Sequence, residues 1–553
     1  MDVVEGEGRR GTKRKYSGDN GRVSARAQTP ADVTTSASHP LSGHGYGHAH
    51  ASTFPPSLSP QPEEIDERSL DARERRFATL YATELDFRRL GEQDEDLRAL
   101  LGGERASHLD FADPRAVMQL TKTLLRLDFG LRIELPPDRL CPPVPNRHNY
   151  ILWLKELLDS TSACYTGTYD PARRVLGLDV GTGASLIYPL LGCAQRPRWS
   201  FLATDVDAKS LAHARRNAEL NGLLGSRVRV VDRDVAAPFL VPLDDLGVDA
   251  LDFVMVNPPF YTSESELLDL ARQKSRPPNS ACTGAPIEMV CEGGEIGFVQ
   301  RIIDESLVLR GRVQWYTSML GKQSSLDVCV ARLRAHGIDN YAVTAFVQGN
   351  KTRRWALGWS FDRRRPSARA SRGFEPTAGK KLLPHPTELT AFEGSLSNCG
   401  PGALETALCD AMESLDLVSW RWDRPASRGV GFAAGNVWAR AYRRRNKRPA
   451  MLRGDDSSSG NVEPCTKPSN PETTTDLKDC SFGFAVSVHV DGDGAHDTKD
   501  RVKVEVRWLQ GQEYALFESF TGTLRNVVLR VLRGHVDDAA AKKSKGSSPA
   551  GAD

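Results

Sequence analysis

The apolar positions of residues 174–361 fall into short runs, separated by longer stretches in which apolar residues recur every three or four positions. The short, β-rich runs predict buried strands, and the longer periodic stretches predict amphipathic helices between them. The predicted strands are 175–180, 201–204, 227–231, 251–256, 313–318, 341–347 and 354–361. Because strands that alternate with helices form sheets covered on both faces, we expect a Rossmann-like α/β domain with seven strands, the last two forming an antiparallel edge.

Periodic patterns continue on both sides of this predicted domain. Upstream, residues 67–101 have helical spacing, and Asp113-Pro114 starts a further helix that Gly130 can end. Downstream, two units that each combine strands with a helix predict one small α+β domain. The elements expected there are strands 419–422, 431–442, 482–490 and 502–509, and helices 402–415 and 514–532.

Composition divides the chain into five parts. Residues 1–65 and 536–553 are poor in large apolar residues, which is typical of disordered tails. The Arg-rich stretch 362–384 indicates a basic linker. The two remaining parts are 66–361, the α/β domain with an N-terminal helical extension, and 385–535, the α+β domain with a disordered polar insert at 450–476.

Charge and cysteine content limit the kinds of function. The 553-residue chain has a formal net charge of only +2, so affinity for nucleic acid must come from local basic clusters. Its 10 cysteines form no C-x-x-C pair, which argues against a zinc site or a disulfide framework and for a reducing compartment. No apolar run reaches about 18 residues, so we expect no membrane span. Lys13-Arg14-Lys15 is either a nuclear import signal or plain solvated tail.

The strongest candidate for chemistry is the tetrapeptide Asn257-Pro258-Pro259-Phe260. It directly follows the predicted strand 251–256, and ligands bind at the carboxyl edge of open α/β sheets. The side-chain oxygen of Asn257 and the carbonyl of Pro258 can accept hydrogen bonds from a planar –NH2 group, while Phe260 can stack on the ring that carries it. This arrangement suits methylation of an exocyclic amine. Taken alone, the tetrapeptide is equally compatible with a Pro-rich turn.

A glycine-rich turn upstream favours the interpretation that the tetrapeptide holds an exocyclic amine for methylation. Asp179, Gly181, Thr182 and Gly183 form a D-x-G-x-G pattern at the end of the first strand, where the backbone can approach a ligand closely. Asp205 ends the second strand and is placed to accept both hydroxyls of a ribose. The third glycine of a dinucleotide motif is missing, and two prolines follow the fourth strand, so S-adenosylmethionine is favoured over NAD.

Other candidate residues carry weaker signals. Asp234 follows the third strand and is a candidate for the cofactor adenine, or else an exposed loop acid. We expect Arg147 just before a helix at 151–158, free to reach a carboxylate or an RNA backbone. Three basic groups are candidates for RNA contact: a predicted lid after Phe260, an edge-strand turn, and a cationic run near residue 445. Their residues are Arg272, Lys274 and Arg276; Lys351, Arg353 and Arg354; and Arg443, Arg444 and Arg445.

With these residues in place, the sequence from about Leu109 to Phe361 resembles the methyltransferase-like protein sixteen family, nuclear enzymes that methylate adenosine N6 in U6 spliceosomal RNA. Bacterial relatives that methylate adenine in ribosomal RNA share most of the core motifs. The C-terminal domain resembles the family's RNA-binding region only loosely. The resemblance rests on Asp110–Pro114, Asp128–Leu131, Val144-Pro145, Arg147, Asn149-Tyr150, Asp179–Ser185, Ile187–Gly192, Asn257–Phe260, Glu292–Glu295, Trp315-Tyr316, Met319–Lys322 and Arg354–Leu357.

The resemblance implies that Arg147, Gly181, Asp205 and Asn257 contact S-adenosylmethionine or its pocket, and that Asn257–Phe260 hold the target adenine. Asp205 stands where the family is expected to carry Glu, and Asp234 does not align clearly. We therefore expect a monomeric, nuclear, metal-free RNA adenine-N6 methyltransferase. Three alternatives stay open: a ribosomal RNA adenine methyltransferase, a protein glutamine methyltransferase, and an RNA-binding protein that senses S-adenosylmethionine.

Overall fold

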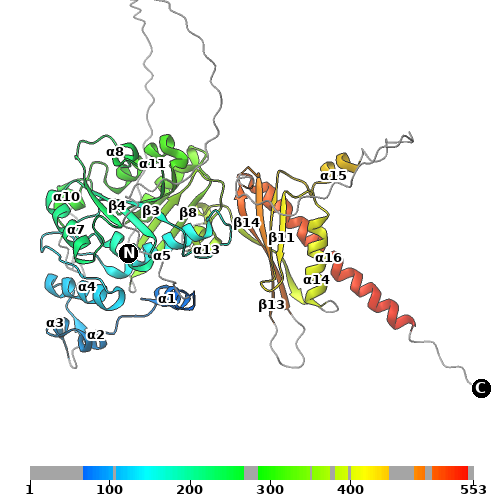
Figure 1. Ribbon diagram of the computed structural model, residues 1–553, viewed down its shortest axis with the longest axis horizontal. Helices are drawn as coiled ribbons and strands as arrows, with labels where there is room; N and C mark the ends of the chain where they lie inside the picture. The colour runs from blue at the N-terminus through cyan, green and yellow to red at the C-terminus, as the bar shows by residue number, and fades with distance from the viewer. Residues whose placement is uncertain are drawn as a thin grey trace, which may run out of the picture. The chain divides into compact units, whose positions relative to one another are not determined.

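The computed structural model describes residues 67–103, 107–266, 284–348, 352–373, 380–395, 400–447, 477, 479–491 and 501–545. They form a seven-stranded sheet, a five-stranded sheet and a short pair of strands, with helices against the two large sheets (Figure 1). The expected N-terminal tail, with its candidate import signal, and the whole polar insert at 450–476 lie outside the described residues. Within the described part of the chain, no helix is long and apolar enough to cross a membrane.

The larger sheet has the strand order β5-β4-β3-β6-β7-β9-β8. The first five strands in this order run parallel, whereas β9 is antiparallel to both β7 and β8. The seven predicted strands and their antiparallel edge are therefore confirmed. The strands are β3 (Val175–Val180), β4 (Trp199–Asp205), β5 (Val228–Asp232), β6 (Leu251–Val256), β7 (Val313–Leu320), β8 (Tyr341–Gln348) and β9 (Thr352–Trp359).

Helices cover both faces of this sheet and make a three-layer domain. One core cluster joins the strands to α4, α5, α6 and α7, and a second joins their other face to α8, α11 and α12. The chain steps outward from β3 to β5 and then returns to β6 on the other side of β3, so the carboxyl ends of β3, β4 and β6 flank the switch point at which such sheets bind ligands. The helices are α4 (Pro114–Phe129), α5 (Val144–Ser160), α6 (Ile187–Gln195), α7 (Ala208–Leu220), α8 (Leu243–Leu246), α11 (Gly294–Leu309) and α12 (Gln323–Ala335).

Two local expectations within this domain need correction. Arg147 does not precede its helix but lies in the first turn of α5, because the stiff segment before Val144 already fixes the chain in a helix start. The helix expected between the first two strands does not follow the glycine turn directly but begins at Ile187, since Leu186 has φ 54° and interrupts helical geometry. The start of α4 at Asp113-Pro114 and its left-handed end at Gly130 are confirmed.

The N-terminal helices dock on the α/β domain through charged contacts. In α1 (Glu67–Thr79), the carboxylate of Glu74 lies 2.9 Å from Nζ of Lys155 and 3.2 Å from the guanidinium of Arg196. Both cations are buried, and Arg196 also pairs with Asp159 at 2.6 Å. Glu74 therefore balances positive charge that the domain has removed from water. The short elements that follow are α2 (Phe87–Gln93), α3 (Glu95–Arg98), β1 (Leu101–Gly102) and β2 (His108–Leu109).

The second large sheet is antiparallel, with strand order β10-β14-β13-β12-β11. The helices α14 (Pro401–Glu413) and α16 (Tyr514–Lys545) pack together (Figure 1). Aromatic residues such as Phe484, Trp508 and Phe520 belong to the core of this domain. The strands expected at 482–490 and 502–509 are present. The strands are β10 (Glu388–Ser395), β11 (Ser419–Asp423), β12 (Arg428–Ala433), β13 (Phe482–Asp491) and β14 (Arg501–Gly511).

Two predictions in this region are wrong. The strand expected to reach Tyr442 ends at Ala433, because Trp438 turns into the core, where its Nε1 donates to Ser519 Oγ at 3.1 Å. The chain then forms α15 (Arg440–Lys447), so the Arg run lies on a helix. The tail expected from residue 536 is helical as far as Lys545, as part of α16.

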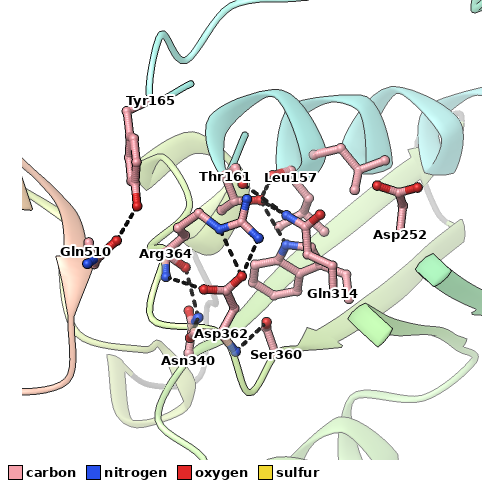
Figure 2. Close-up of polar contacts among 12 residues, drawn as sticks. Leu157, Thr161, Tyr165, Asp252, Gln314, Asn340, Ser360, Asp362, Arg364 and Gln510 are labelled. Atoms are coloured by element: carbon pink, nitrogen blue, oxygen red, sulfur yellow. Dashed lines mark hydrogen bonds and ion pairs between the residues drawn. The ribbon is translucent and has the colours of Figure 1, made fainter. Parts of the chain in front are cut away.

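The stretch expected as a basic linker is tied to its neighbours. Arg364 Nε donates to the carboxylate of Asp362 at 2.8 Å, and Asn340 Nδ2 donates to the carbonyls of Asp362 and Arg364 at 2.8 and 3.0 Å (Figure 2). Backbone hydrogen bonds join Arg363 and Arg365 to β14. The first residues of the predicted basic linker therefore have paired polar groups and are joined to the five-stranded sheet. The helices α13 (Ala368–Arg372) and η3 (Lys380–Leu382) follow.

Candidate functional site

A pocket opens at the carboxyl ends of β3, β4 and β6. It brings together the turn after β3, the last residue of β4 and the first residues after β6, which are far apart in the sequence. Its wall includes six of the predicted site residues that follow these strands: Gly181, Thr182, Gly183, Asp205, Asn257 and Pro259. The predicted meeting of these residues at one edge of the sheet is what the parallel topology produces.

The glycine-rich turn forms the floor of the pocket. Gly181 and Gly183 have φ values of 71° and 65°, which L side chains rarely adopt, and no neighbouring atom lies within 4 Å of the place where a Cβ on Gly181 would stand. The amides of Gly181 and Thr182 both donate to the carbonyl of Thr204 at 2.9 Å. The turn is thus held by backbone contacts and leaves its open side to a ligand.

Asp205 supports this turn through its carboxylate. Its Oδ2 accepts the amide of Gly183 at 2.8 Å, and its Oδ1 accepts the amides of Val206 and Asp207 at 2.8 and 3.0 Å. Burial raises the pKa of Asp205, while these three amides oppose the rise. The remaining lone pairs of the carboxylate lie at the pocket wall, where an acceptor for ribose hydroxyls is expected.

Asp179 lies deeper, under the same turn, and is almost fully buried. Its Oδ2 accepts the hydroxyl of Thr182 at 2.7 Å, whereas its Oδ1 is buried without a hydrogen-bond partner in the described part of the chain. Burial raises the pKa of Asp179 to about 7, and the nearby negative charge of Asp205 adds to the rise. A cationic group bound in the pocket would favour the ionised carboxylate.

Arg147 is also buried and reaches the pocket from α5. It donates from Nη1 to the hydroxyl of Tyr188 at 2.8 Å and approaches the sulfur of Met319 at 3.2 Å. Its Nε is buried without a partner among the described residues. A buried guanidinium with a spare donor can bind a carboxylate, as the sequence predicted.

Two residues of the tetrapeptide after β6, Asn257 and Pro259, line the pocket, whereas Pro258 and Phe260 are not among its lining residues. The Oδ1 atom of Asn257 is buried and accepts no hydrogen bond from the described residues. The ring of Phe260 lies beneath the guanidinium of Arg354, whose Cζ is 5.5 Å from the ring centre. An orphaned acceptor beside a fixed aromatic ring is the arrangement needed to receive a planar amine.

The polar groups at this site match the polar groups of S-adenosylmethionine. The pocket offers acceptors for ribose hydroxyls at Asp205 and a buried donor for a carboxylate at Arg147, and the buried carboxylate of Asp179, which could hold an ammonium group, lies beneath the glycine turn of its wall. Each of the last two has a polar atom without a partner in the described residues, which a ligand with both charges would satisfy. Within the same residues, no group of three or more His, Cys, Asp or Glu side chains could hold a metal ion.

The chain is similar to a family model and to several named proteins. A family model described as RNA methyltransferase matches residues 66–363. The chain belongs to the METTL16 family of RNA methyltransferases. A Danio rerio protein named "RNA N(6)-adenosine-methyltransferase mettl16" is 35% identical over 451 residues, which cover 76% of this chain and 90% of the relative. A Schizosaccharomyces pombe "U6 small nuclear RNA (adenine-(43)-N(6))-methyltransferase" is 42% identical over 277 residues, 50% of this chain and 68% of the relative.

Solved structures of METTL16 are similar as well. The human catalytic domain in complex with MAT2A 3′UTR hairpin 6 is 39% identical and covers 51% of this chain and 94% of that chain, with a TM-score of 0.44. The N-terminal domain of human METTL16 in complex with SAH is 37% identical, covers 51% of this chain and 96% of that chain, and has a TM-score of 0.42.

The structure describes only some of the basic residues that were predicted to contact RNA. Arg353 is exposed on β9, whereas its neighbour Arg354 is half-buried against Phe260. The run Arg443–Arg445 is exposed on α15. Four predicted residues lie outside the described residues: Arg272, Lys274, Arg276 and Lys351. Asp234 lines the rim of the pocket, but it is exposed and its Oδ1 accepts the amide of Ala236 at 2.8 Å.

Sequence reasoning missed several members of the pocket wall. Glu288 and Ile287 reach it from α10 (Pro286–Met289), and Phe298 and Arg301 reach it from α11. The sequence carries a helix-start signal at Ala285-Pro286, with a glutamate at the third helical position. That signal predicts a short helix within the expected lid, but it does not tell where the helix lies in the fold.

Proposed function

We propose that this protein transfers a methyl group from S-adenosylmethionine to N6 of adenosine in RNA, with U6 small nuclear RNA as the leading substrate. The observation that carries the proposal is the buried, unpaired Oδ1 of Asn257 at the wall of a pocket suited to this cofactor. A buried acceptor that has no donor among the described residues costs stability, so its retention next to Phe260 in the sequence favours a ligand that supplies the N–H.

The cofactor would be held by residues that the turn and α5 already fix. Asp205 would accept its ribose hydroxyls, Arg147 would bind its carboxylate, and Asp179 would face its ammonium group. When bound, the cofactor supplies an electrophilic methyl group on a sulfonium. Burial of Arg147 and Asp179 excludes water and strengthens both charge contacts. Asp234, being exposed at the rim, is a weaker candidate for the cofactor adenine.

The target adenine would be held by Asn257–Phe260. The N6 lone pair of adenine is delocalised into the ring, so the amine is a poor nucleophile. Accepting its two N–H groups at Asn257 Oδ1 and at the Pro258 carbonyl favours a pyramidal nitrogen and aims the lone pair into the cofactor pocket. Phe260 would stack on the base, and alignment of the reacting atoms within about 3–3.5 Å supplies much of the acceleration. The nitrogen loses its proton after attack, so no side chain has to act as a base beforehand.

Exposed basic residues and the names of relatives both support RNA as the substrate. Two relatives are named for N6 of adenosine in RNA or in U6 small nuclear RNA, and one neighbour was solved with an RNA hairpin. Exposed Arg353 and the helix of Arg443–Arg445 would contact phosphates, together with the predicted contacts at Arg272, Lys274, Arg276 and Lys351. With a U6 substrate, the protein works in the nucleus. A monomeric state stays a prediction.

The test compares wild type with Asn257→Ala in the presence of labelled S-adenosylmethionine. The substrates are U6 RNA, ribosomal RNA, unrelated hairpins and whole-cell protein, and the RNA products are digested to nucleosides. We expect N6-methyladenosine in U6 RNA, lost by a factor of about 10² or more in the variant, with RNA affinity preserved. Asn257→Asp is the conservative control, because it keeps an acceptor at the same place.

Other outcomes identify other functions. Label in ribosomal RNA keeps the chemistry and changes the substrate. Label at glutamine in protein would show that the same site holds a glutamine side-chain amide in place of the N6 amine of adenine. Binding of RNA and cofactor without transfer would overturn the enzymatic proposal and leave a sensor.

A further inference from the structure

The segment 284–291 passes along the mouth of the cofactor pocket. Its short helix α10 places Ile287 and Glu288 on the pocket wall, with Glu288 next to the turn that contains Gly183. One carboxylate oxygen of Glu288 lies 3.7 Å from the position that a Cβ on Gly183 would take. The segment therefore borders the space in which the ribose side of the cofactor would lie.

The Glu288 carboxylate joins this segment to another part of the wall. Its Oε2 accepts the amide of Leu140 and the amide of Ala285, both at 2.9 Å. Leu140 lies shortly before α5, the helix that carries Arg147. A single carboxylate thus ties together two wall segments that are 148 residues apart in the sequence. Hydrogen bonds from amides to a charged acceptor are stronger than neutral ones.

The same segment is paired with the tetrapeptide that would hold the adenine. The amide of Tyr261, which follows Phe260, donates to the carbonyl of Met289 at 3.0 Å. The amide of Cys291 donates back to the carbonyl of Tyr261 at 3.0 Å. Displacement of 284–291 would therefore pull on the backbone next to Phe260.

The charges around Glu288 act in opposite directions. Burial raises the pKa of its carboxyl, and the negative charge of Asp205 adds to the rise. The amides of Ala285 and Leu140 and the guanidinium of Arg139 oppose it. Arg139 is itself held at 2.9 Å by Asp207 and by Asp138. The Glu288 carboxyl is therefore held in place by hydrogen bonds from the two amides and not by contacts with water.

We infer that Glu288 is a positioning residue that latches segment 284–291 onto the cofactor pocket and, through Tyr261, fixes Asn257–Phe260 relative to that pocket. The inference rests on the cofactor proposed above but not on the identity of the RNA. When the latch is intact, the pocket wall and the adenine-holding loop are in place before either ligand arrives. Without it, the wall opens and both sites lose order together.

The test uses the full chain with three variants. Glu288→Ala removes the acceptor, Glu288→Gln keeps one side-chain oxygen, and Asp252→Ala is a matched control. Asp252 is also a half-buried carboxylate that accepts a backbone amide, that of Leu176 at 2.8 Å, but it lies on β6 at the end away from the pocket. Affinity for S-adenosylhomocysteine is measured by calorimetry, and hydrogen–deuterium exchange is measured without cofactor.

We expect Glu288→Ala to weaken S-adenosylhomocysteine binding about tenfold, and Glu288→Gln to restore most of the affinity. In Glu288→Ala, the amides of Leu140, Ala285, Tyr261 and Cys291 should exchange faster, while those of β3 should not change. Asp252→Ala should leave both the affinity and these four amides as in wild type.

Two results would overturn the inference while leaving the proposed function intact. One is an affinity within about twofold of wild type in Glu288→Ala, with unchanged exchange at Tyr261. The other is faster exchange throughout β3 as well, which would assign Glu288 to general stability. If the wild-type protein bound no S-adenosylhomocysteine, the proposed function itself would be wrong.

Discussion

The guanidinium of Arg354 lies over the ring of Phe260, with 5.5 Å between Cζ and the ring centre. The two residues are 94 positions apart and come from β9 and from the loop after β6. A cation on one face of the ring fixes its plane and leaves the rest of the ring for another flat partner. Arg354 was expected as a phosphate contact, but its position makes it a support for the residue that would stack on the adenine.

Replacement of Arg354 by Met should therefore lower turnover more than it lowers RNA affinity. Loss of the cation–π contact frees the Phe260 ring, and we expect kcat to fall about tenfold. Arg353→Met is the matched control, because Arg353 is exposed on the same strand. That variant should weaken RNA binding and reduce the magnitude of its salt slope by about 1 with kcat nearly unchanged. Equal effects of the two variants in steady-state kinetics would contradict this assignment.

Gly321 leaves space for the ring of Phe260 because it has no side chain. A Cβ at this position would lie 3.0 Å from Cδ1 of Phe260 and 3.1 Å from Oε2 of Glu295, which accepts the Gly321 amide at 2.5 Å. We expect Gly321→Ala to displace Phe260 by a few tenths of an ångström and to lower kcat roughly three- to tenfold, while cofactor affinity is unchanged. Gly311→Ala has no neighbour within 4 Å and should behave as wild type. A Gly321→Ala enzyme with normal turnover would show that the ring has room to move.

The buried carboxyl of Asp179 makes the stability of the cofactor-free protein depend on pH. Burial raises the pKa of Asp179 to about 7 from the ordinary value of 3.8, so between these values the folded state holds a proton that the unfolded state has released. The free energy of unfolding should therefore fall as pH rises from 4 to 7, with Asp179 contributing roughly 2–4 kcal/mol of that fall. Urea unfolding of wild type and Asp179→Asn at several pH values tests this. Parallel profiles for the two proteins would refute it.

Glu74 should be needed for the docking of α1. Its carboxylate contacts the buried cations Lys155 and Arg196, and burial lowers the pKa of Lys155 to about 8. Glu74→Gln leaves these cations with less negative charge, so we expect a loss of roughly 2 kcal/mol in the free energy of unfolding. Asp71→Asn, on the exposed side of α1, is the control and should change it by less than about 0.5 kcal/mol. Chemical denaturation of both variants at neutral pH provides the measurement.

Much of the α/β domain follows from the sequence alone. The seven strands, the start of α4 at Asp113-Pro114 and the turn at Gly181–Gly183 were all predicted, because periodicity, capping and positive φ are set by residues close in the chain. The meeting of Asp205 and Asn257 at one edge was also predictable, since parallel strands bring their carboxyl ends together.

Tertiary structure alone decided what surrounds these residues. The pairing of Arg354 with Phe260, the contact of Glu288 with Leu140, and the place of Arg147 inside a buried helix depend on the packing of elements far apart in the chain. Local pattern indicates which side chains can donate, accept or stack, but it contains no distance between elements. Those distances are fixed only when the helices and strands close around a common core. That step gives a polar side chain its partner or leaves it, like Asn257 Oδ1, without one among the residues that the structure describes.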